Sequence, residues 1–186
     1  MPEQGNDIDL ALIQAIAGGD VPALNELYTR HGANILNYLT SLLHDRQLAE
    51  EVLQDVMLAV WENAAHFRGD SKVRTWLLSI ARNKAINTQR RGTPALVQMD
   101  EEFYATDTTP LEKVERKTQQ QTMQAALEQL PPFHREILVL IFYHQLSGAE
   151  VAEVLGINVG TVKSRLHRAK EMLRRVLLSM GETSNA

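Results

Sequence analysis

Two stretches of the chain concentrate the residue types that bind nucleic acid. Residues 66–92 contain seven basic residues against one acid, Asp70, a net charge of +6. Residues 159–177 contain six basic residues against Glu171, a net charge of +5. The whole chain has a net charge of −4 and a pI of about 5.9, but phosphate affinity follows local clusters of Lys and Arg. The sequence therefore predicts two nucleic-acid contact sites, although a charge run is also typical of a solvated helix face.

The first basic stretch interleaves aromatic rings and an amide with its cations. Aromatic rings can stack on unpaired bases while cations follow the sugar–phosphate backbone. An amide such as that of Asn83 can hydrogen-bond a base edge once the base has left the duplex. The alternative is that Trp76 belongs to a hydrophobic core, which is compatible with a place at the edge of a base pocket. The candidate residues are Phe67, Arg68, Lys72, Trp76, Arg82, Asn83 and Lys84.

The second basic stretch has the pattern of a helix-turn-helix. Ser147 is expected to start a short helix, and Gly156 offers the left-handed conformation that a tight turn needs. A second helix is expected from about residue 159 to residue 179, and such a helix can present its N-terminal residues to base edges in a major groove. The alternative is an ordinary helical hairpin with a basic outer face. The candidate residues are Thr161, Lys163, Ser164, Arg165, His167 and Arg168.

A predicted helix over residues 45–65 combines acidic and large apolar side chains on its outer face. Leu53, Met57, Leu58 and Trp61 accompany its acidic and amide residues. This mixture suits a protein–protein interface with apolar anchors inside an acidic rim. The alternative is that Trp61 and Leu53 pack on the neighbouring helix. The candidate interface residues are Glu51, Gln54, Asp55, Met57 and Trp61.

The elements that must position these residues are helices. Aromatic residues make up only 5% of the chain, whereas good helix formers such as Leu, Ala and Glu are plentiful. Residues 93–115 hold six acids against one base, a net charge of −5. Gly92, Pro94 and Pro110 punctuate residues 92–117, which show no sustained periodicity. We therefore predict an all-α protein with two small helical domains, residues 1–92 and 118–186, the second one a helix-turn-helix, joined by a flexible acidic linker over residues 93–117.

Composition and motif content exclude several functions. The chain has no cysteine, which excludes disulfides, thiolate metal sites and a cysteine nucleophile. Its longest apolar run, residues 137–142, is far short of the roughly 20 residues that span a bilayer, and its acidic N-terminus does not start like a signal peptide. It lacks a Gly-rich phosphate loop, a zinc-binding His-Glu-x-x-His pattern and a nucleophile elbow. We expect a cytoplasmic protein that is not an enzyme, with no cofactor, no metal and no direct membrane insertion.

Four motifs, in this order and spacing, carry a family resemblance. They are Leu48-Ala-Glu-Glu-Val-Leu-Gln-Asp-Val, Phe67-Arg-Gly-Asp-Ser with Thr75-Trp-Leu-Leu-Ser-Ile-Ala-Arg-Asn, Leu130-Pro-Pro with Arg135-Glu, and Gly160-Thr-Val-Lys-Ser-Arg-Leu-His-Arg-Ala. From about residue 11 to residue 175 the chain resembles bacterial RNA polymerase sigma factors of the extracytoplasmic-function (ECF) class, which belong to the sigma-70 family.

The resemblance implies partners and roles that the spacing alone does not. Glu51, Gln54 and Asp55 fall where the family contacts the clamp coiled coil of the largest polymerase subunit. Phe67, Trp76 and Asn83, with Arg82 and Lys84 beside them, fall where the family opens the minus-ten promoter element and captures a flipped base. Lys163, Ser164, Arg165, His167 and Arg168 match the positions that read the minus-thirty-five element. The resemblance also implies docking of the second domain on the β-subunit flap and regulation by an anti-sigma factor.

Two further classes of function remain as alternatives. One is a helix-turn-helix regulator that binds duplex DNA independently of polymerase, although such a protein has no need of a base-stacking surface over residues 67–91. The other is an interaction module such as an anti-anti-sigma mimic, which would keep the fold and lose the basic clusters. The basic clusters are intact in this chain.

Overall fold

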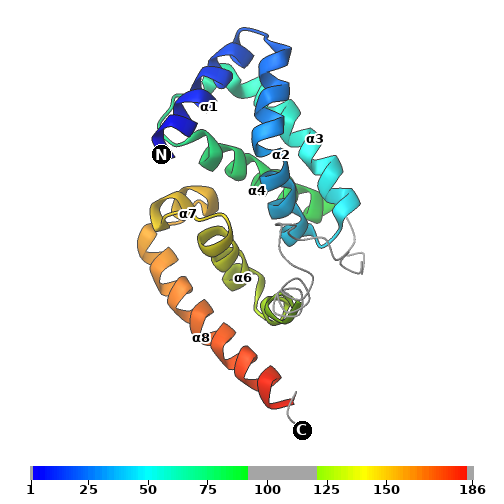
Figure 1. Ribbon diagram of the computed structural model, residues 1–186, viewed down its shortest axis with the longest axis vertical. Coiled ribbons are helices and arrows are strands. Elements are labelled where there is room, and N and C mark those ends of the chain that lie inside the picture. Colours follow the sequence, from blue (N-terminus) through cyan, green and yellow to red (C-terminus); the bar gives the residue numbers. More distant parts are fainter. Residues whose placement is uncertain (1, 92–120, 184–186) are drawn as a thin grey trace, which may run out of the picture. The chain divides into compact units, whose positions relative to one another are not determined.

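The computed structural model describes residues 2–91 and 121–183, and every regular element in these two ranges is a helix (Figure 1). This confirms the predicted all-α class. The chain divides into two compact units, which are described one at a time. The predicted acidic linker over residues 93–117 lies outside the described residues. None of the helices in the described ranges is both long enough and apolar enough to cross a membrane.

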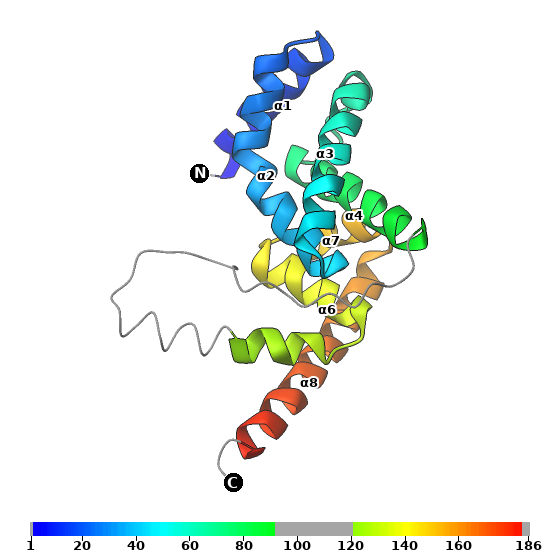
Figure 2. The same cartoon turned by 90° about the vertical axis from the view of Figure 1, so that its right-hand side faces the viewer.

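The first unit is built from four helices and a short 3-10 turn. α2 packs against α3 and against α4, α3 also packs against α4, and α1 lies along α2. Figure 2 shows α2 and α3 side by side, with α4 running across them. The buried centre of this unit includes Leu27, Ile35, Leu39, Val56, Val60 and Leu77. The elements are α1 (Pro2–Ala17), α2 (Val21–Leu43), α3 (Arg46–Asn63), η1 (Ala64–His66) and α4 (Val73–Arg91).

Local sequence signals start the second and third helices. The Asp20 carboxylate accepts a hydrogen bond from the Ala23 amide at 3.1 Å, and Asp45 accepts one from the Leu48 amide at 3.0 Å. Each aspartate is the N-cap residue of its helix, where it satisfies an amide that has no partner within the helix. The predicted helix over residues 45–65 is therefore confirmed, and α2 begins after Asp20 by the same kind of cap.

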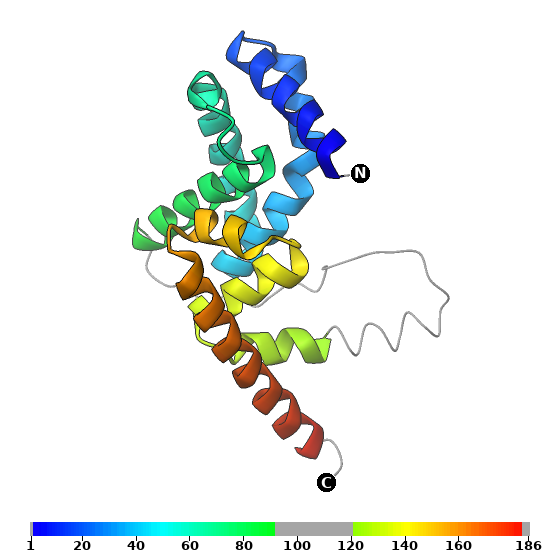
Figure 3. The same cartoon turned by 90° about the vertical axis from the view of Figure 1, so that its left-hand side faces the viewer.

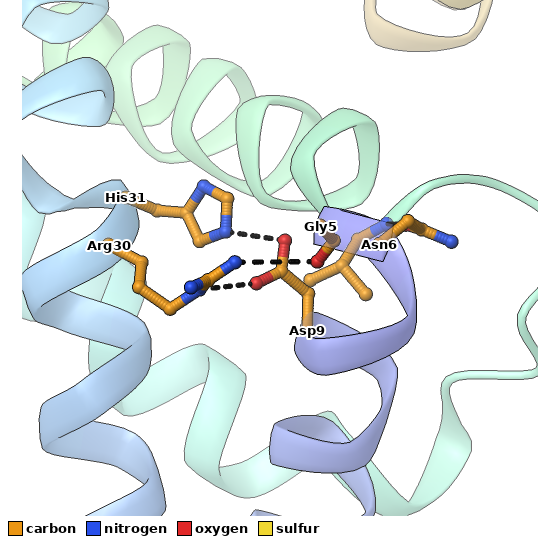
Figure 4. A network of polar contacts seen from close by, with 6 residues as sticks. Gly5, Asn6, Asp9, Arg30 and His31 are labelled. Carbon is orange, nitrogen blue, oxygen red and sulfur yellow. Dashed lines mark hydrogen bonds and ion pairs between the residues drawn. The ribbon is translucent and has the colours of Figure 1, made fainter. Parts of the chain in front are cut away.

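A buried carboxylate joins α1 to α2 (Figure 4). Asp9 on α1 accepts a hydrogen bond from Arg30 Nε at 2.8 Å, and its other oxygen lies 2.8 Å from His31 Nε2. The side chains of Asp9 and His31 are only 7% and 11% exposed. An ionised carboxylate can only accept hydrogen bonds, so both α2 side chains donate to it. Arg30 also reaches the carbonyl of Gly5 on α1.

The N-terminus of α4 is fixed from outside its own sequence. Asn6 on α1 accepts a hydrogen bond from the Val73 amide at 3.1 Å, across 67 residues of chain. This bond satisfies one of the first amides of α4, which have no acceptor within the helix. Asp9 holds α1 on α2, and Asn6 holds the start of α4 on α1. The three helices are therefore linked through α1.

The second unit contains the helices that follow residue 120. Residues 121–128 are helical, and α6 packs against α8. Leu130, Leu138 and Ala169 are buried together, with Leu166, Leu173 and Val176 packed around them. Figure 3 shows α7 joined to the long helix α8 by a short turn. The elements are α6 (Pro132–Leu138), the π-helical turn η2 (Val139–Tyr143), α7 (Gly148–Leu155) and α8 (Val159–Thr183).

Arg135 on α6 closes the C-terminal end of the helical segment 121–128. Its guanidinium donates to the carbonyls of Leu127 at 3.0 Å, Glu128 at 2.7 Å and Leu130 at 3.2 Å. Burial lowers the pKa of the Arg135 guanidinium, and the nearby charge of Glu128 acts in the opposite direction. The last carbonyls of a helix have no partner within it, so this one side chain joins that segment to α6.

The Asp9 contact leads to a prediction on stability. Asp9→Asn removes the charge that Arg30 and His31 share and replaces one acceptor oxygen with a donor group. We expect the free energy of unfolding of the first unit to fall by about 1.5–3 kcal/mol, the range for hydrogen bonds to charged groups. Trp61 and Trp76 are the only two tryptophans of the chain and both belong to this unit, so tryptophan fluorescence in a urea titration reports its unfolding.

Asp7→Asn is the matched control, because Asp7 lies on the same helix and is exposed. Its effect is expected to stay within about 0.5 kcal/mol, as for most surface substitutions. Equal unfolding midpoints for the two variants would show that the buried carboxylate contributes nothing to the first unit.

Candidate nucleic-acid interface

α7 and α8 form a helix-turn-helix whose ends are fixed by local hydrogen bonds. Ser147 Oγ accepts from the Glu150 amide, and Glu150 returns the bond by accepting from the Ser147 amide at 2.8 Å, a reciprocal capping box. Gly156 has a φ of 65°, a left-handed conformation that favours glycine. The Asn158 side chain then accepts from the Thr161 amide at 2.7 Å and starts α8. The predicted start, turn and second helix are all confirmed.

α8 turns a polar face outward from this framework. Val162 and Ala169 are buried on one side of the helix, and four of the predicted side chains are exposed on the other: Lys163, Ser164, His167 and Arg168. Lys and Arg can donate to guanine acceptors in the major groove, and Ser can hydrogen-bond bases or phosphates. The N-terminal half of α8 therefore presents the donors that a recognition helix needs.

Two predicted residues of α8 are placed differently from these four. The Thr161 hydroxyl donates to Asn158 Oδ1 at 2.9 Å, so it takes part in the cap of the helix. Arg165 is half-buried, and its guanidinium carbon lies 5.4 Å from the centre of the Phe133 ring. This contact with Phe133 could not be predicted from the sequence, because the two residues lie 32 positions apart on different helices.

The first basic stretch presents an aromatic pair and an amide on one surface of the first unit. Phe67 follows η1 in the turn before α4, and its ring centre lies 4.7 Å from that of Trp76, with the two planes tilted by 37°. Asn83 is exposed and follows Trp76 by seven residues, which returns it to the same helix face about 10 Å along the axis. Both aromatic side chains are half-buried, so Trp76 contributes to packing and also reaches the surface.

The cations of this stretch lie in the turn before α4 and along α4. Arg68 pairs with Asp70 at 3.1 Å, but both side chains are highly exposed, so the pair stabilises the turn little. Lys72 is exposed, whereas Arg82 and Lys84 are half-buried. Phe67 and Arg68 also line a cleft of about 270 Å³ between this turn and α1, together with Leu10, Ile13, Gln14, Ala17, Ala64, Ala65 and Gly69.

α3 exposes an acidic face with one apolar centre. Glu51, Gln54 and Asp55 are exposed as predicted, and Trp61 is half-buried at the edge of this face. Leu58 is 55% exposed and lies among them, whereas Leu53 and Met57 are only 4% and 8% exposed. The expectation that Met57 lies on the outer face is therefore wrong, and for Leu53 the alternative of packing on a neighbouring helix is confirmed. Because α3 packs against both α2 and α4, its buried arc is wider than a single partner helix would require, and it includes these two residues.

A metal centre is not among the features of the described ranges. No group of three or more His, Asp or Glu side chains there could hold a metal ion. The surfaces of α3, α4 and α8 instead offer hydrogen-bond donors, acceptors and apolar contacts, which are the means of macromolecular recognition.

Comparison with known proteins places both units in one family. Residues 27–94 match sigma-70 region 2 and residues 120–173 match sigma-70 region 4. The chain is similar to the RNA polymerase sigma factor YlaC of Bacillus subtilis, with 32% identity over 82% of this chain and 91% of that protein. It is also similar to the ECF RNA polymerase sigma factor SigL of Mycobacterium tuberculosis, with 31% identity over 94% of this chain and 99% of that protein.

Solved structures agree with this assignment. The structure of CnrH in complex with the cytosolic domain of CnrY matches with a TM-score of 0.68 and 26% identity, over 92% of this chain and 98% of that one. The sigma factor RpoE of Bartonella quintana, solved in complex with the anti-sigma factor NepR, matches in fold with a TM-score of 0.66 and 24% identity, over 84% and 98% of the two chains.

The chain belongs to the RNA polymerase sigma factors of the ECF class. It is a transcription initiation factor that binds core RNA polymerase and promoter DNA and directs the enzyme to promoters. The resemblance found in the sequence motifs is confirmed.

Proposed function

We propose that the acidic face of α3 binds core RNA polymerase at the clamp coiled coil of its largest subunit. The exposed Glu51, Gln54 and Asp55 supply polar contacts around Leu58, which takes the role of apolar anchor that the buried Met57 does not have. An apolar centre inside a polar rim is the usual composition of a protein–protein contact. Trp61 borders the same face and extends its apolar area.

The surface of α4 and the preceding turn captures the minus-ten element in this proposal. A base that leaves the duplex stacks beside the Phe67 and Trp76 rings, and stacking on an aromatic ring is worth about 1–3 kcal/mol per base. Asn83 hydrogen-bonds an exposed base edge, since its side chain is exposed on the same helix face. Arg68, Lys72, Arg82 and Lys84 follow the backbone of the strand. These contacts offset the few kcal/mol that unstacking costs.

α8 reads the minus-thirty-five element in this proposal. The observations that support this role are the capped N-terminus of α8 and its exposed polar side chains, Lys163, Ser164, His167 and Arg168. A first domain of residues 1–92 binds the clamp coiled coil and the minus-ten element. A second domain of residues 118–186 reads the minus-thirty-five element and also docks on the β flap. The chain recruits core polymerase to promoters and helps to open the promoter DNA, without catalysing a reaction. It acts in the cytoplasm. An anti-sigma factor is its proposed regulator, supported by the likeness to CnrH, which was solved with CnrY.

The polymerase contact gives the first test. The triple variant Glu51→Ala/Gln54→Ala/Asp55→Ala is expected to weaken co-elution with bacterial core RNA polymerase at least tenfold, because the polar rim around Leu58 is lost. The matched control is Asp7→Ala/Gln14→Ala/Glu26→Ala, which removes the same three residue types from exposed positions on α1 and α2. Wild-type chain that is folded and does not associate with core polymerase would refute the contact and favour a regulator that binds duplex DNA alone.

Asn83→Ala tests base capture in the minus-ten element. The variant loses one exposed amide, so the fold is retained, and we expect about a two- to tenfold loss of affinity, equivalent to one hydrogen bond of about 0.5–1.5 kcal/mol. The measurement is binding of the polymerase-bound chain to single-stranded non-template DNA spanning the minus-ten element. Asn87→Ala is the control, one turn further along α4 and also exposed. Equal affinities for the two variants would remove Asn83 from the site.

Arg168→Ala tests the reading of the upstream element. A promoter is first selected by the polymerase-bound chain from duplexes with a randomised upstream element. Loss of Arg168 is expected to lower affinity and to relax the preference at one base pair by about 1–3 kcal/mol. Arg175→Ala is the control, because Arg175 is exposed two turns further along α8. An unchanged base preference for Arg168→Ala would count against direct base contact.

A further inference from the structure

Two exposed phenylalanine rings of the second unit each carry a cation of α8. Phe133 on α6 and Phe142 in η2 are 59% and 60% exposed. The Arg165 guanidinium carbon lies over the Phe133 ring at 5.4 Å from its centre, and Lys170 Nζ lies over the Phe142 ring at 5.2 Å. Both distances are within the range of a cation–π interaction. A single exposed apolar side chain needs no explanation, but a ring that holds a cation from the recognition helix does.

Helix geometry separates Arg165 from the outward face of α8. At about 100° per residue, Arg165 lies only about 40° around the helix from Ala169, which is fully buried. Lys163, Ser164, His167 and Arg168 lie about 100–160° from Ala169 by the same rule. The Arg165 side chain therefore leaves the helix at the border between the core and the exposed face, next to α6.

The Phe133 ring determines where the Arg165 charge is held. Within the described part of the chain, no carboxylate forms an ion pair with Arg165. A guanidinium can stack its flat face on an aromatic ring and keep its N–H groups available in its own plane. Held over the Phe133 ring, the Arg165 guanidinium lies at the flank of α8 next to α6.

We propose that Phe133 is a positioning residue for promoter recognition, and that it holds Arg165 where the guanidinium contacts the sugar–phosphate backbone bordering the groove. This inference rests on the proposed reading of the upstream element by α8. Sugar–phosphate backbones form the walls of a major groove, so a donor at the flank of a recognition helix meets phosphate, and a donor on its outward face meets bases. Arg165 thus supports affinity and register, and Arg168 supports sequence preference.

The test uses the full chain bound to core polymerase and the promoter selected as above. Phe133→Leu is expected to weaken promoter affinity about two- to fivefold, the loss of an exposed cation–π pair of about 0.5–1 kcal/mol. Phe133→Tyr, which keeps the ring, is expected to retain wild-type affinity. In Arg165→Ala the affinity falls about equally for every upstream sequence, and the salt dependence of log affinity decreases by about one unit of slope.

A double-mutant cycle separates positioning from simple packing. Phe133→Leu added to Arg165→Ala is expected to cause no further loss, because the ring acts only through the guanidinium. Phe142→Leu is the matched control, since it removes an equally exposed ring that holds Lys170, and its effect is expected to multiply with that of Arg165→Ala. Thermal unfolding of Phe133→Leu is expected to match that of the wild type.

Three results would overturn the inference. The first is independent, multiplying effects of Phe133→Leu and Arg165→Ala. The second is a change of base preference at a single position in Arg165→Ala. The third is wild-type affinity in Phe133→Leu while Arg168→Ala still weakens binding, which leaves the reading role of α8 intact. If Arg168→Ala also binds like wild type, the proposed reading role is refuted, and the inference is refuted with it.

Discussion

The first unit depends on one buried carboxylate. Asp9 brings Arg30 and His31 together and holds α1 on α2, and α1 in turn supplies Asn6 to the first turn of α4. Phe67 lies in the turn before α4, and Trp76 lies on α4. The position of these two aromatic rings therefore depends on the contacts that Asn6 and Asp9 make from α1, at the N-terminal end of the unit. A buried charge is costly unless it is paired and hydrogen-bonded. The three-residue contact meets that condition, and it makes the placement of α1 a requirement for the surface that we propose binds the minus-ten element.

The second unit is organised by local signals. The capping box of Ser147 and Glu150, the left-handed Gly156 and the Asn158 cap lie within twelve positions of one another. They define where α7 ends and where α8 starts, and hence which residues of α8 face outward. Arg135 adds a longer link, because its guanidinium joins the helical segment 121–128 to α6. A recognition helix set by short-range contacts keeps its register without help from the rest of the chain.

The features that could be predicted from the sequence are those that arise over short separations. Ser147 lies next to the helix that it starts, and Gly156 lies in the turn that its conformation permits, so a short stretch of sequence predicts both. The sequence pattern puts Met57 on the wrong face and leaves the side of Leu53 open, because periodicity does not reveal that α3 has two partner helices and a correspondingly wide buried arc. Asp9 with His31, Asn6 with Val73 and Phe133 with Arg165 unite residues 22, 67 and 32 positions apart. Their residue types are ordinary at those positions, and only the fold brings them together.

The acidic face of α3 and the basic helix α4 belong to the same compact unit. Residues 1–65 hold ten acids against two bases, a net charge of −8, and residues 66–92 have a net charge of +6. Clusters of one sign of charge act on a charged partner before any surfaces touch. Steering of this kind acts on the rate of encounter more than on the lifetime of the complex, and dissolved salt screens it over about 10 Å at 0.1 M. The ionic composition of the cell therefore helps to set how quickly this factor binds core polymerase.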